Sequence, residues 1–446
     1  MQDDRTNNAE EAILFRPILY TGKKFYVAVG GLLTVIAWAV YAWAIQFTYG
    51  LGVTGLDRPV YWGLYITNFV FFIGVSHAGT LISAILRICQ AEWRRPITRA
   101  AEVITVVVLF IGASNIIVDL GRPDRALYVI WYGRLQSPLL WDVISISTYV
   151  TASMIYLYLP LIPDIALVRD RTTKRRWLYR TLALGWQGTP RQQRALHAAI
   201  AIMAVLVIPI AVSVHTVVSW VFAMTIQPMW HSTIFGPYFV VGAIFSGIAA
   251  IIIAMAVIRK GYHLEDYLKP VHFSNLGILL LVMSLLWLYF TFAEYLTTYY
   301  GNEPAEMAVF WAKVTGSYAP YFWAMVVTNF VIPFLILANW RTRTIAGTVI
   351  ASAFITVGMW LERFTIVVPT LINPRLPLQA EIYHPTWVEW SIMAGDFALF
   401  ALLYLIFSKL FPIVSIWEIQ EGREKGVKET LERIRTYLPG REAEVE

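Results

Sequence analysis

The chain has 446 residues, of which 58% are hydrophobic, 15% aromatic and 14% charged, with a formal net charge of +6. Soluble proteins carry about a quarter charged residues, so this composition excludes an ordinary soluble protein and a disordered one. Long unbroken apolar runs also exclude an outer-membrane barrel, whose strands alternate over about 10 residues. The composition therefore predicts an all-α integral membrane protein.

A membrane-spanning helix needs about 20 mostly apolar residues. Ten segments meet this requirement: 25–46, 61–88, 100–118, 141–161, 195–222, 233–258, 272–299, 321–338, 342–361 and 386–410. Residues 1–24 lack the pattern of a signal peptide, so we expect them to stay as a cytoplasmic N-terminus. Residues 25–60 then hold the first helix and an external loop, and the helix at 386–410 leads into an amphipathic cytoplasmic tail at 411–446.

The distribution of basic residues sets the orientation. With these ten helices, 28 of the 35 Lys and Arg residues fall on one side of the membrane and 7 on the other. Basic loops stay in the cytoplasm, so both termini are predicted to be cytoplasmic in a bacterial inner membrane. The positive charge thus reflects topology rather than nucleic-acid binding. Residues 162–194 interleave Trp177 and Tyr179 with basic residues, which predicts a surface helix on anionic lipid or a partner.

An internal repeat divides the chain. Ser-Pro-Leu-Leu-Trp at 137–141 opens the fourth helix and Ala-Pro-Tyr-Phe-Trp at 319–323 opens the eighth, both entering from outside. Small residues recur at matching depths of the second and sixth helices. We interpret 61–222 and 233–361 as two parallel four-helix bundles, formed by helices 2–5 and 6–9, with helices 1 and 10 peripheral. The first bundle carries most of the polar motifs described next and is the expected half for a functional site.

Polar residues inside a membrane are costly and are therefore functional candidates. His77 lies ten residues from Arg87 at the cytoplasmic edge, or about 15 Å into the membrane. Asn68 and Ser76 share one helical stripe beside it, with Gly79, so that a helix or a flat ring can approach closely. The alternative is that His77 only forms a hydrogen bond to a neighbouring helix.

The external loop between the third and fourth helices is the densest polar region. One reaction that needs such groups inside a membrane is quinol oxidation, which releases two protons and two electrons. A His or carboxylate beside the quinol hydroxyls can accept the protons. His77, Asp119 and Asp142 are therefore the catalytic candidates, and the candidate binding residues are Asn68, Ser76, His77, Arg122, Ser137 and Trp141. Alternatively, Asp142 only caps a helix and the loop arginines only pair with aspartates.

Further polar residues are buried in the remaining helices. A proton path through the second bundle is predicted from four residues: His215, Glu294, Glu362 and Asp396. Alternatively these are isolated polar groups, and Glu362, placed near the outer end of its helix, pairs with Arg363. Only His77 and His215 lie well inside helices, at depths estimated to differ, so no haem is expected. The single cysteine, Cys89, excludes a cysteine-ligated iron–sulfur cluster on this chain, and no metal site is expected.

Three motifs carry a resemblance to a known family. Val75 to Ser83 (VSHAGTLIS), the Gly121-Arg122-Pro123 loop and Ser137 to Asp142 (SPLLWD) resemble the NrfD/polysulfide reductase membrane-subunit family. The ten-helix layout with a basic tail is most similar to the larger NrfD-type subunits of alternative complex III, specifically the ActC type. In the family's smaller members a His follows the helix-2 Asn within a few residues, whereas Phe71 and Phe72 stand there in this chain.

The resemblance implies a haem-free integral subunit that binds and oxidises quinol or menaquinol near the external face. It also implies partners: an external iron–sulfur protein, c-type cytochromes, a homologous NrfD-type subunit and the surrounding lipid. By motif, the quinol site would include Asn68, His77, Asp119, Arg122 and Asp142. Three alternatives stay open: an ActF-like subunit acting mainly in proton translocation, a structural anchor, and a secondary transporter, whose repeats are however often inverted.

Overall fold

The computed structural model describes residues 15, 17, 18, 20–173, 175–376 and 382–422. Within these residues, ten helices or continuous helical runs are long and apolar enough to cross a membrane. They are α2 (Lys23–Tyr49), the run α3–α5 (Leu64–Ile88), α6 (Thr98–Asp119), α8 (Pro138–Arg171), α10 (Pro190–Ala223), α11 (Phe235–Tyr262), α12 (Pro270–Gly301), the run α14–α15 (Ala319–Leu337), α16 (Ile345–Ile372) and α17 (Trp387–Leu410). The predicted all-α class with ten membrane-spanning helices is confirmed, and the chain is a multi-pass membrane protein.

Short helices lie between these spans. They are η1 (Leu51–Val53), η3 (Glu92–Arg94), η4 (Pro123–Arg125), α7 (Tyr128–Trp131), α9 (Arg176–Leu182) and α13 (Pro304–Val314). In the region predicted as a basic surface helix, α9 bears Trp177, which is exposed, and Tyr179, which is buried and donates to the carbonyl of Leu410 at 3.0 Å. This helix therefore packs against the end of α17 through Tyr179.

Two helices are longer than predicted. The α8 helix continues past Pro160 and Pro163 to Arg171, ten residues beyond the predicted end at 161. The carbonyl of Pro160 accepts hydrogen bonds from Arg99 Nη2 and Trp417 Nε1 at 2.7 Å each, which holds this part of α8 against α6 and the segment after α17. The α16 helix reaches Ile372 rather than 361, so Glu362 lies in its interior and not near its outer end.

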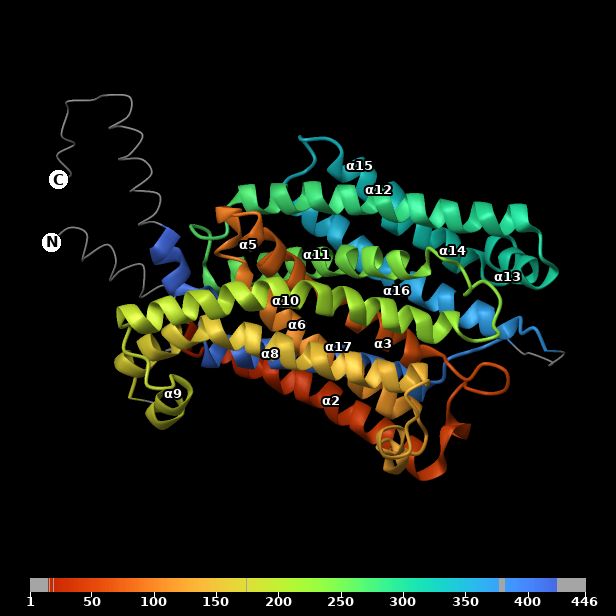
Figure 1. The fold of residues 1–446 in the computed structure, drawn as a ribbon, viewed down its shortest axis with the longest axis horizontal. Coiled ribbons are helices and arrows are strands. Elements are labelled where there is room, and N and C mark those ends of the chain that lie inside the picture. Colours follow the sequence, from red (N-terminus) through yellow and green to blue (C-terminus); the bar gives the residue numbers. More distant parts are fainter. Residues whose placement is uncertain (1–14, 16, 19, 174, 377–381, 423–446) are drawn as a thin grey trace.

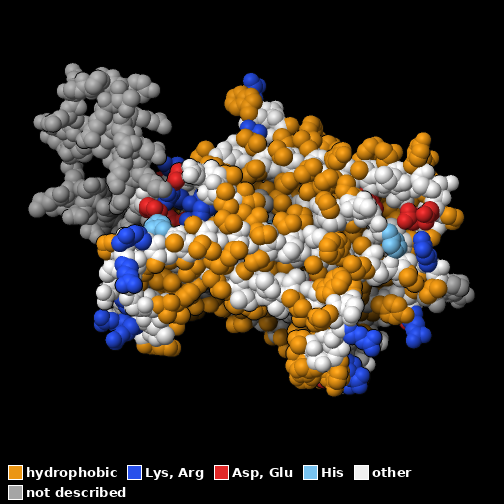
Figure 2. Space-filling model, in the orientation of Figure 1, with side chains coloured by type: hydrophobic (Ala, Val, Ile, Leu, Met, Phe, Trp, Pro, Cys, Tyr) orange, Lys and Arg blue, Asp and Glu red, His pale blue; other side chains and the backbone are white. Residues whose placement is uncertain are grey.

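The long helices run side by side between two ends of the molecule (Figure 1). At one end of the molecule α2 begins, α17 ends and α9 is found; we call this the basic end. The other end carries α13, and we call it the opposite end. Figure 2 shows hydrophobic side chains over most of the flank, with Lys and Arg concentrated toward the ends. This distribution matches an apolar belt that faces lipid.

Helix packing brings the two predicted halves together. The α3–α5 run packs on α6 and α10, and α8 packs on both of these helices; α11, α12, α14–α15 and α16 form a second set of mutual contacts. However, α3 also packs directly on α11 and α16, and α10 packs on α11. The division at 61–222 and 233–361 therefore stays an interpretation. The peripheral helices α2 and α17 pack mainly against each other, and α17 also contacts α6.

The centre of the α3–α5 run departs from regular α-helix. The run consists of α3 (Leu64–Val75), α4 (His77–Gly79), η2 (Thr80–Ile85) and α5 (Leu86–Ile88). The segment η2 is a π-helix. Wide turns of this kind occur frequently at functional sites. At Gly79 an added Cβ would lie 2.5 Å from Thr105 Oγ1, so only glycine allows α6 this close. The predicted small-residue stripe is thus used for helix contact.

A segment after α17 packs onto the basic end. Residues 416–422 are helical. The Asp164 carboxylate accepts hydrogen bonds from the backbone N–H groups of Ile416 and Trp417 at 3.1 Å each. Asp164 also pairs with Arg99 at 2.5 Å, with both side chains essentially buried. Residues 423–446 of the predicted amphipathic tail lie outside the described residues.

Candidate functional site

Two histidines meet at the centre of the molecule. His77 in α4 and His215 in α10 have ring centroids 3.8 Å apart and planes at 73°, and each side chain is 2% exposed. None of their ring nitrogens has a hydrogen-bond partner in the described part of the chain. The expectation that their depths differ is wrong, because α10 extends further along the molecule than its predicted span, so helix ends do not mark equal heights. We call these two residues the histidine pair.

The geometry of the histidine pair limits its chemistry. Two axial histidines hold a haem iron between their rings, whereas these rings touch each other. The pair therefore does not fit a haem held between them. Two imidazoles in contact instead bring together ring nitrogens that can each accept or donate a proton.

Hydroxyl groups extend from the histidine pair toward the basic end. The Tyr149 ring lies 5.8 Å from that of His77, and its hydroxyl is 2.8 Å from Thr80 Oγ1. Farther along, Ser83 Oγ lies 2.5 Å from Glu102 Oε1 and 3.0 Å from the Tyr156 hydroxyl. Thr80 and Ser83 both belong to the π-helical η2, which turns them toward the tyrosines. Sequence reasoning missed Glu102 and both tyrosines, although Tyr149 and Tyr156 are seven residues apart on one face of α8.

On the other side of the histidine pair lies a buried ion pair in α16. Arg363 Nη1 is 2.7 Å from Glu362 Oε2, and both side chains are 1% exposed. Trp287 Nε1 donates to the other Glu362 oxygen at 2.8 Å. The Glu362–Arg363 pairing named above as an alternative is thus present. Arg363 is close enough to interact electrostatically with His215. We call the series of polar groups from Glu362 and Arg363 through the histidine pair to Glu102 the polar line.

A second polar region surrounds Asn68. Trp360 Nε1 donates to Asn68 Oδ1 at 2.8 Å, and the amides of Asn68 and Asn115 lie beside the Asp396 carboxylate. Asn68 Nδ2, Asn115 Oδ1 and Asp396 Oδ2 are buried without a partner in the described residues. We call Asn68, Asn115, Trp360 and Asp396 the Asn68 cluster. Asp396, predicted in a path with Glu294 and Glu362, lies in this cluster instead.

Asp119 lies on the opposite-end side of the Asn68 cluster. It follows Asn115 by four residues, so both project from the same face of α6. Its carboxylate is near Tyr65 and Glu389, and its Oδ1 has no partner in the described residues. Glu389, which sequence reasoning missed, is fully buried and accepts hydrogen bonds from Tyr383 and two backbone N–H groups. The structure thus brings Asn68 and Asp119 into one polar region.

Other predicted residues do not join this region. Arg122 pairs with exposed Asp124 at 3.0 Å, which is the alternative named for the loop. Trp141 Nε1 donates to the carbonyl of Leu135 at 2.5 Å, and Ser137 is the N-cap residue of α8 without a side-chain capping bond. In the same way, the Ser76 hydroxyl donates to the backbone carbonyl of Ile73 at 2.5 Å.

Asp142 is buried but isolated. Its Oδ1 has no hydrogen-bond partner, and no interaction among the described residues joins it to His77 or Asp119. His77 likewise contacts His215 and Tyr149 rather than either carboxylate. The three catalytic candidates are therefore distributed over different parts of the first half of the chain.

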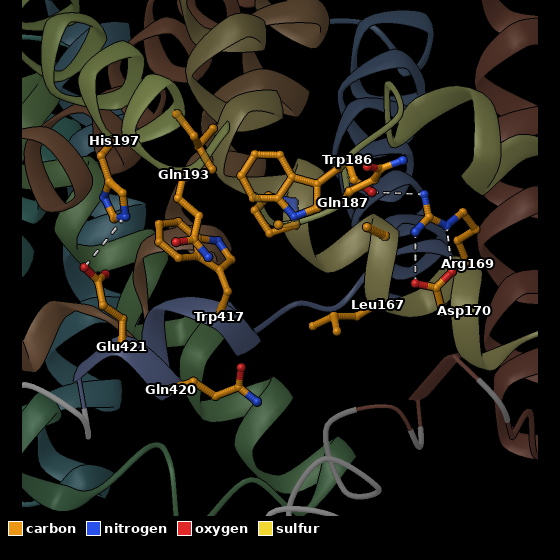
Figure 3. A pocket seen from close by; sticks show the side chains of 14 residues that line it. Leu167, Arg169, Asp170, Trp186, Gln187, Gln193, His197, Trp417, Gln420 and Glu421 are labelled. Carbon is orange, nitrogen blue, oxygen red and sulfur yellow. Dashed lines mark hydrogen bonds and ion pairs between the residues drawn. The ribbon is translucent and has the colours of Figure 1, made fainter. Parts of the chain in front are cut away.

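A cavity of about 560 Å³ lies at the basic end (Figure 3). It is lined from α8, α10 and the segment after α17, and His197 Nε2 lies 3.9 Å from Glu421 Oε1 at its edge. Glu421 in turn pairs with Arg95 at 3.1 Å. None of the predicted site residues lines this cavity, which is a polar recess at the surface rather than a pocket beside the histidine pair.

Comparisons with known proteins cover most of the chain. Residues 52–374 match the family model described as "Polysulphide reductase, NrfD". The chain is 23% identical to an Hdr-like menaquinol oxidoreductase integral membrane subunit of Archaeoglobus fulgidus, over 93% of this chain and 100% of that protein. It is 24% identical to the integral membrane subunit of a menaquinone reductase of Nitratidesulfovibrio vulgaris, over 87% and 92%. A putative dimethyl sulfoxide reductase membrane subunit of Halobacterium salinarum is 25% identical over 89% and 94%.

Proposed function

The chain belongs to the NrfD polysulphide reductase family, and on this premise we propose that it is the quinol-binding, quinol-oxidising membrane subunit of an electron-transfer complex. Two relatives are named for menaquinol or menaquinone chemistry, which supports menaquinol as the substrate. Because a chain with one cysteine cannot by itself hold a cysteine-ligated iron–sulfur cluster, we infer that the electrons leave to a partner. The proposed partners are an external iron–sulfur protein, c-type cytochromes and a homologous NrfD-type subunit, as in an ActC-type arrangement.

The observation that carries this proposal is the Asn68 cluster. It offers a buried amide donor, a buried amide acceptor and a buried carboxylate oxygen; none of these atoms makes a hydrogen bond of normal geometry in the described structure, although both amides interact with Asp396. A buried polar group without a partner costs about 1–3 kcal/mol, so the site favours a ligand with hydroxyl or carbonyl groups. The two oxygens of a quinol match this requirement. The cluster and Asp119 lie toward the opposite end, which the basic-residue distribution places outside the cytoplasm.

In this mechanism the side chains hold the quinol and accept its protons. Asn68, fixed by Trp360, would bind one quinol oxygen, and Asp396 would accept a proton from a hydroxyl. Asp119 would pass that proton toward the external face, which frees Asp396 to accept the second proton, and the second proton leaves by the same route. As the two protons leave, the two electrons pass to the partner's redox centre.

We further propose that the polar line through the interior contributes to proton translocation. The histidine pair lies between the Glu362–Arg363 pair on one side and the hydroxyls that lead to Glu102 on the other. Buried polar residues connected in this way are typical of proton relays in membrane proteins.

The test is Asn68→Leu in the purified complex. Loss of the Nδ2 donor to the quinol, together with the bond from Trp360 that fixes Asn68, is expected to raise the KM for a menaquinol analogue about 10-fold or more, at about 1.4 kcal/mol per factor of ten. Asn329→Leu is the matched control, because Asn329 is equally buried and its Nδ2, like that of Asn68, has no hydrogen-bond partner in the described residues, but it lies in the other half. An unchanged KM in Asn68→Leu would locate the quinol site elsewhere.

A second variant addresses the histidine pair in the proposed proton path. His77→Gln removes the imidazole that exchanges protons but keeps a polar side chain of similar size. Quinol-driven electron transfer at the wild-type rate together with unchanged proton release would remove His77 from the mechanism.

A further inference from the structure

A buried lysine lies at the opposite end of the second half. Lys313 belongs to the short helix α13 and is 4% exposed. It lies close enough to Glu294 in α12 for an electrostatic interaction, but no ion pair within 4.0 Å joins them in the described structure. Burial lowers the pKa of Lys313 to about 8, and Glu294 acts in the opposite direction. A lysine is rarely this buried without a paired carboxylate, so its position requires an explanation.

Two cavities meet at Glu294. One, of about 380 Å³, is lined by His231, Ser232, Glu294 and Glu306 among others. The second, of about 20 Å³, lies farther inside and is lined by Glu294, Lys313, Tyr238 and Tyr295 with apolar neighbours. Glu294 thus separates an outer recess from an inner cavity.

The inner cavity has the properties of a water site. A buried water needs about 10–15 Å³ and two to four polar partners. The inner cavity supplies the room, and Lys313, Glu294 and Tyr238 supply polar groups. Glu294 Oε2 is buried without a hydrogen-bond partner in the described residues. One water molecule would therefore link these three side chains.

The inner cavity also reaches the polar line described above. The Tyr238 hydroxyl accepts from Thr291 Oγ1 at 3.3 Å and lies beside Glu362. Glu362 pairs with Arg363, which is near His215. A series of polar groups thus runs from the outer recess toward the histidine pair, and its last step, from Arg363 to His215, is electrostatic.

We propose that Lys313, Glu294 and one water in the cavity between them and Tyr238 form the external gate of the proton path. This inference rests on the proton-translocating part of the proposed function and adds to it a residue and a water site. The ammonium of Lys313 holds Glu294 as a carboxylate while the gate is at rest. A proton arriving from Glu362 through Tyr238 and the water passes to Glu294 and leaves through the outer recess, which restores the charged pair.

Infrared spectroscopy of the purified full-length chain tests the charge relation. In Lys313→Met, Glu294 loses its cation, and we expect a new carbonyl stretching band of a protonated carboxyl group that disappears in the double variant with Glu294→Gln. Lys260→Met is the matched control, because Lys260 is an exposed lysine of α11 at the basic end, and it should leave the spectrum unchanged. A Lys313→Met spectrum identical to wild type would overturn the proposed pairing.

Proton release by the complex in liposomes tests the gate. Quinol oxidation alone releases one proton per electron, and translocation raises this ratio. We expect Lys313→Met to lower the ratio to one while electron transfer continues. If Lys313→Met is poorly folded, Glu294→Gln, which keeps the side-chain shape, should have the same effect. A wild-type ratio of one refutes the translocation part of the proposed function, whereas a raised ratio that both variants retain refutes the gate alone.

Discussion

The segment that follows α17 is expected to contribute strongly to stability through one glutamate. Glu418 is 1% exposed, forms an ion pair with Arg87 and lies 3.7 Å from Arg94 Nη1. Its backbone carbonyl also accepts from Arg95 Nη1 at 2.7 Å. Glu418→Gln leaves two largely buried guanidinium groups without their counter-charge. Removing one partner of a buried ion pair costs about 3–5 kcal/mol.

Glu421→Gln is the matched control on the same segment. Its carboxylate is 32% exposed and pairs with Arg95 at 3.1 Å. A partly exposed pair contributes about 0–1 kcal/mol, so the two variants should differ by at least about 2 kcal/mol in free energy of unfolding. At about 2 °C per kcal/mol for a large chain, Glu418→Gln should lower Tm by about 6–10 °C and Glu421→Gln by less than about 2 °C.

Thermal unfolding in mild detergent, followed by the fluorescence of the 18 tryptophans, measures both shifts in the complete chain. Replacing Arg87 by Met in the Glu418→Gln background should recover part of the loss, because one uncompensated charge is then removed. Equal Tm shifts for the two glutamate variants would refute the reasoning that burial decides the strength of these pairs.

Three further outcomes are expected. Trp360→Phe removes the 2.8 Å bond to Asn68 and should weaken menaquinol-analogue binding about fivefold, at about 1 kcal/mol, measured by titration of the analogue; unchanged binding would separate Trp360 from the quinol site. Arg363→Leu should lower Tm by several degrees, because the buried Glu362 carboxylate loses its counter-charge. The double variant with Glu362→Leu should restore Tm, since it removes the unpaired charge, and a further loss in the double variant would contradict this. Gly79→Ala places a Cβ 2.9 Å from an α6 backbone carbon and should cost about 1–3 kcal/mol in unfolding free energy; a neutral effect would mean that α6 can shift.

The helices could be predicted from sequence because apolar length alone determines a membrane span. Their relative heights could not. His77 and His215 were each identified as buried polar residues, yet their contact depends on the position of α10 relative to the α3–α5 run along the helix axes. Glu362 was placed near a helix end because an apolar window ended at 361, but Glu362 and Arg363 form a buried ion pair and the helix continues.

The sequence did not identify those site residues whose amino-acid type is common at their position in a helix. Lys313 lies on a short external helix, where a lysine normally faces solvent. Glu102 lies near the start of a helix, where an acidic residue is typical. Asn115 and Trp360 become informative only beside Asn68 and Asp396, which are distant in the chain. Asn68 and Asp119 were identified because a polar residue in or at the end of an apolar helix is costly without a partner or a ligand.

The pairing of α2 with α17 has a consequence for how the protein is made. The hydrogen bond from Trp38 Nε1 to Ser391 Oγ, at 2.9 Å, joins residues 353 positions apart. At about 5–20 residues per second, ribosomal synthesis of that interval takes roughly 18–70 s. During this time α2 is in the bilayer with its buried residues Ala39 and Ala42 facing lipid instead of α17. The helix α2 is thus among the last to reach its main native neighbour, and assembly of this chain depends on α2 staying in the bilayer until α17 is made.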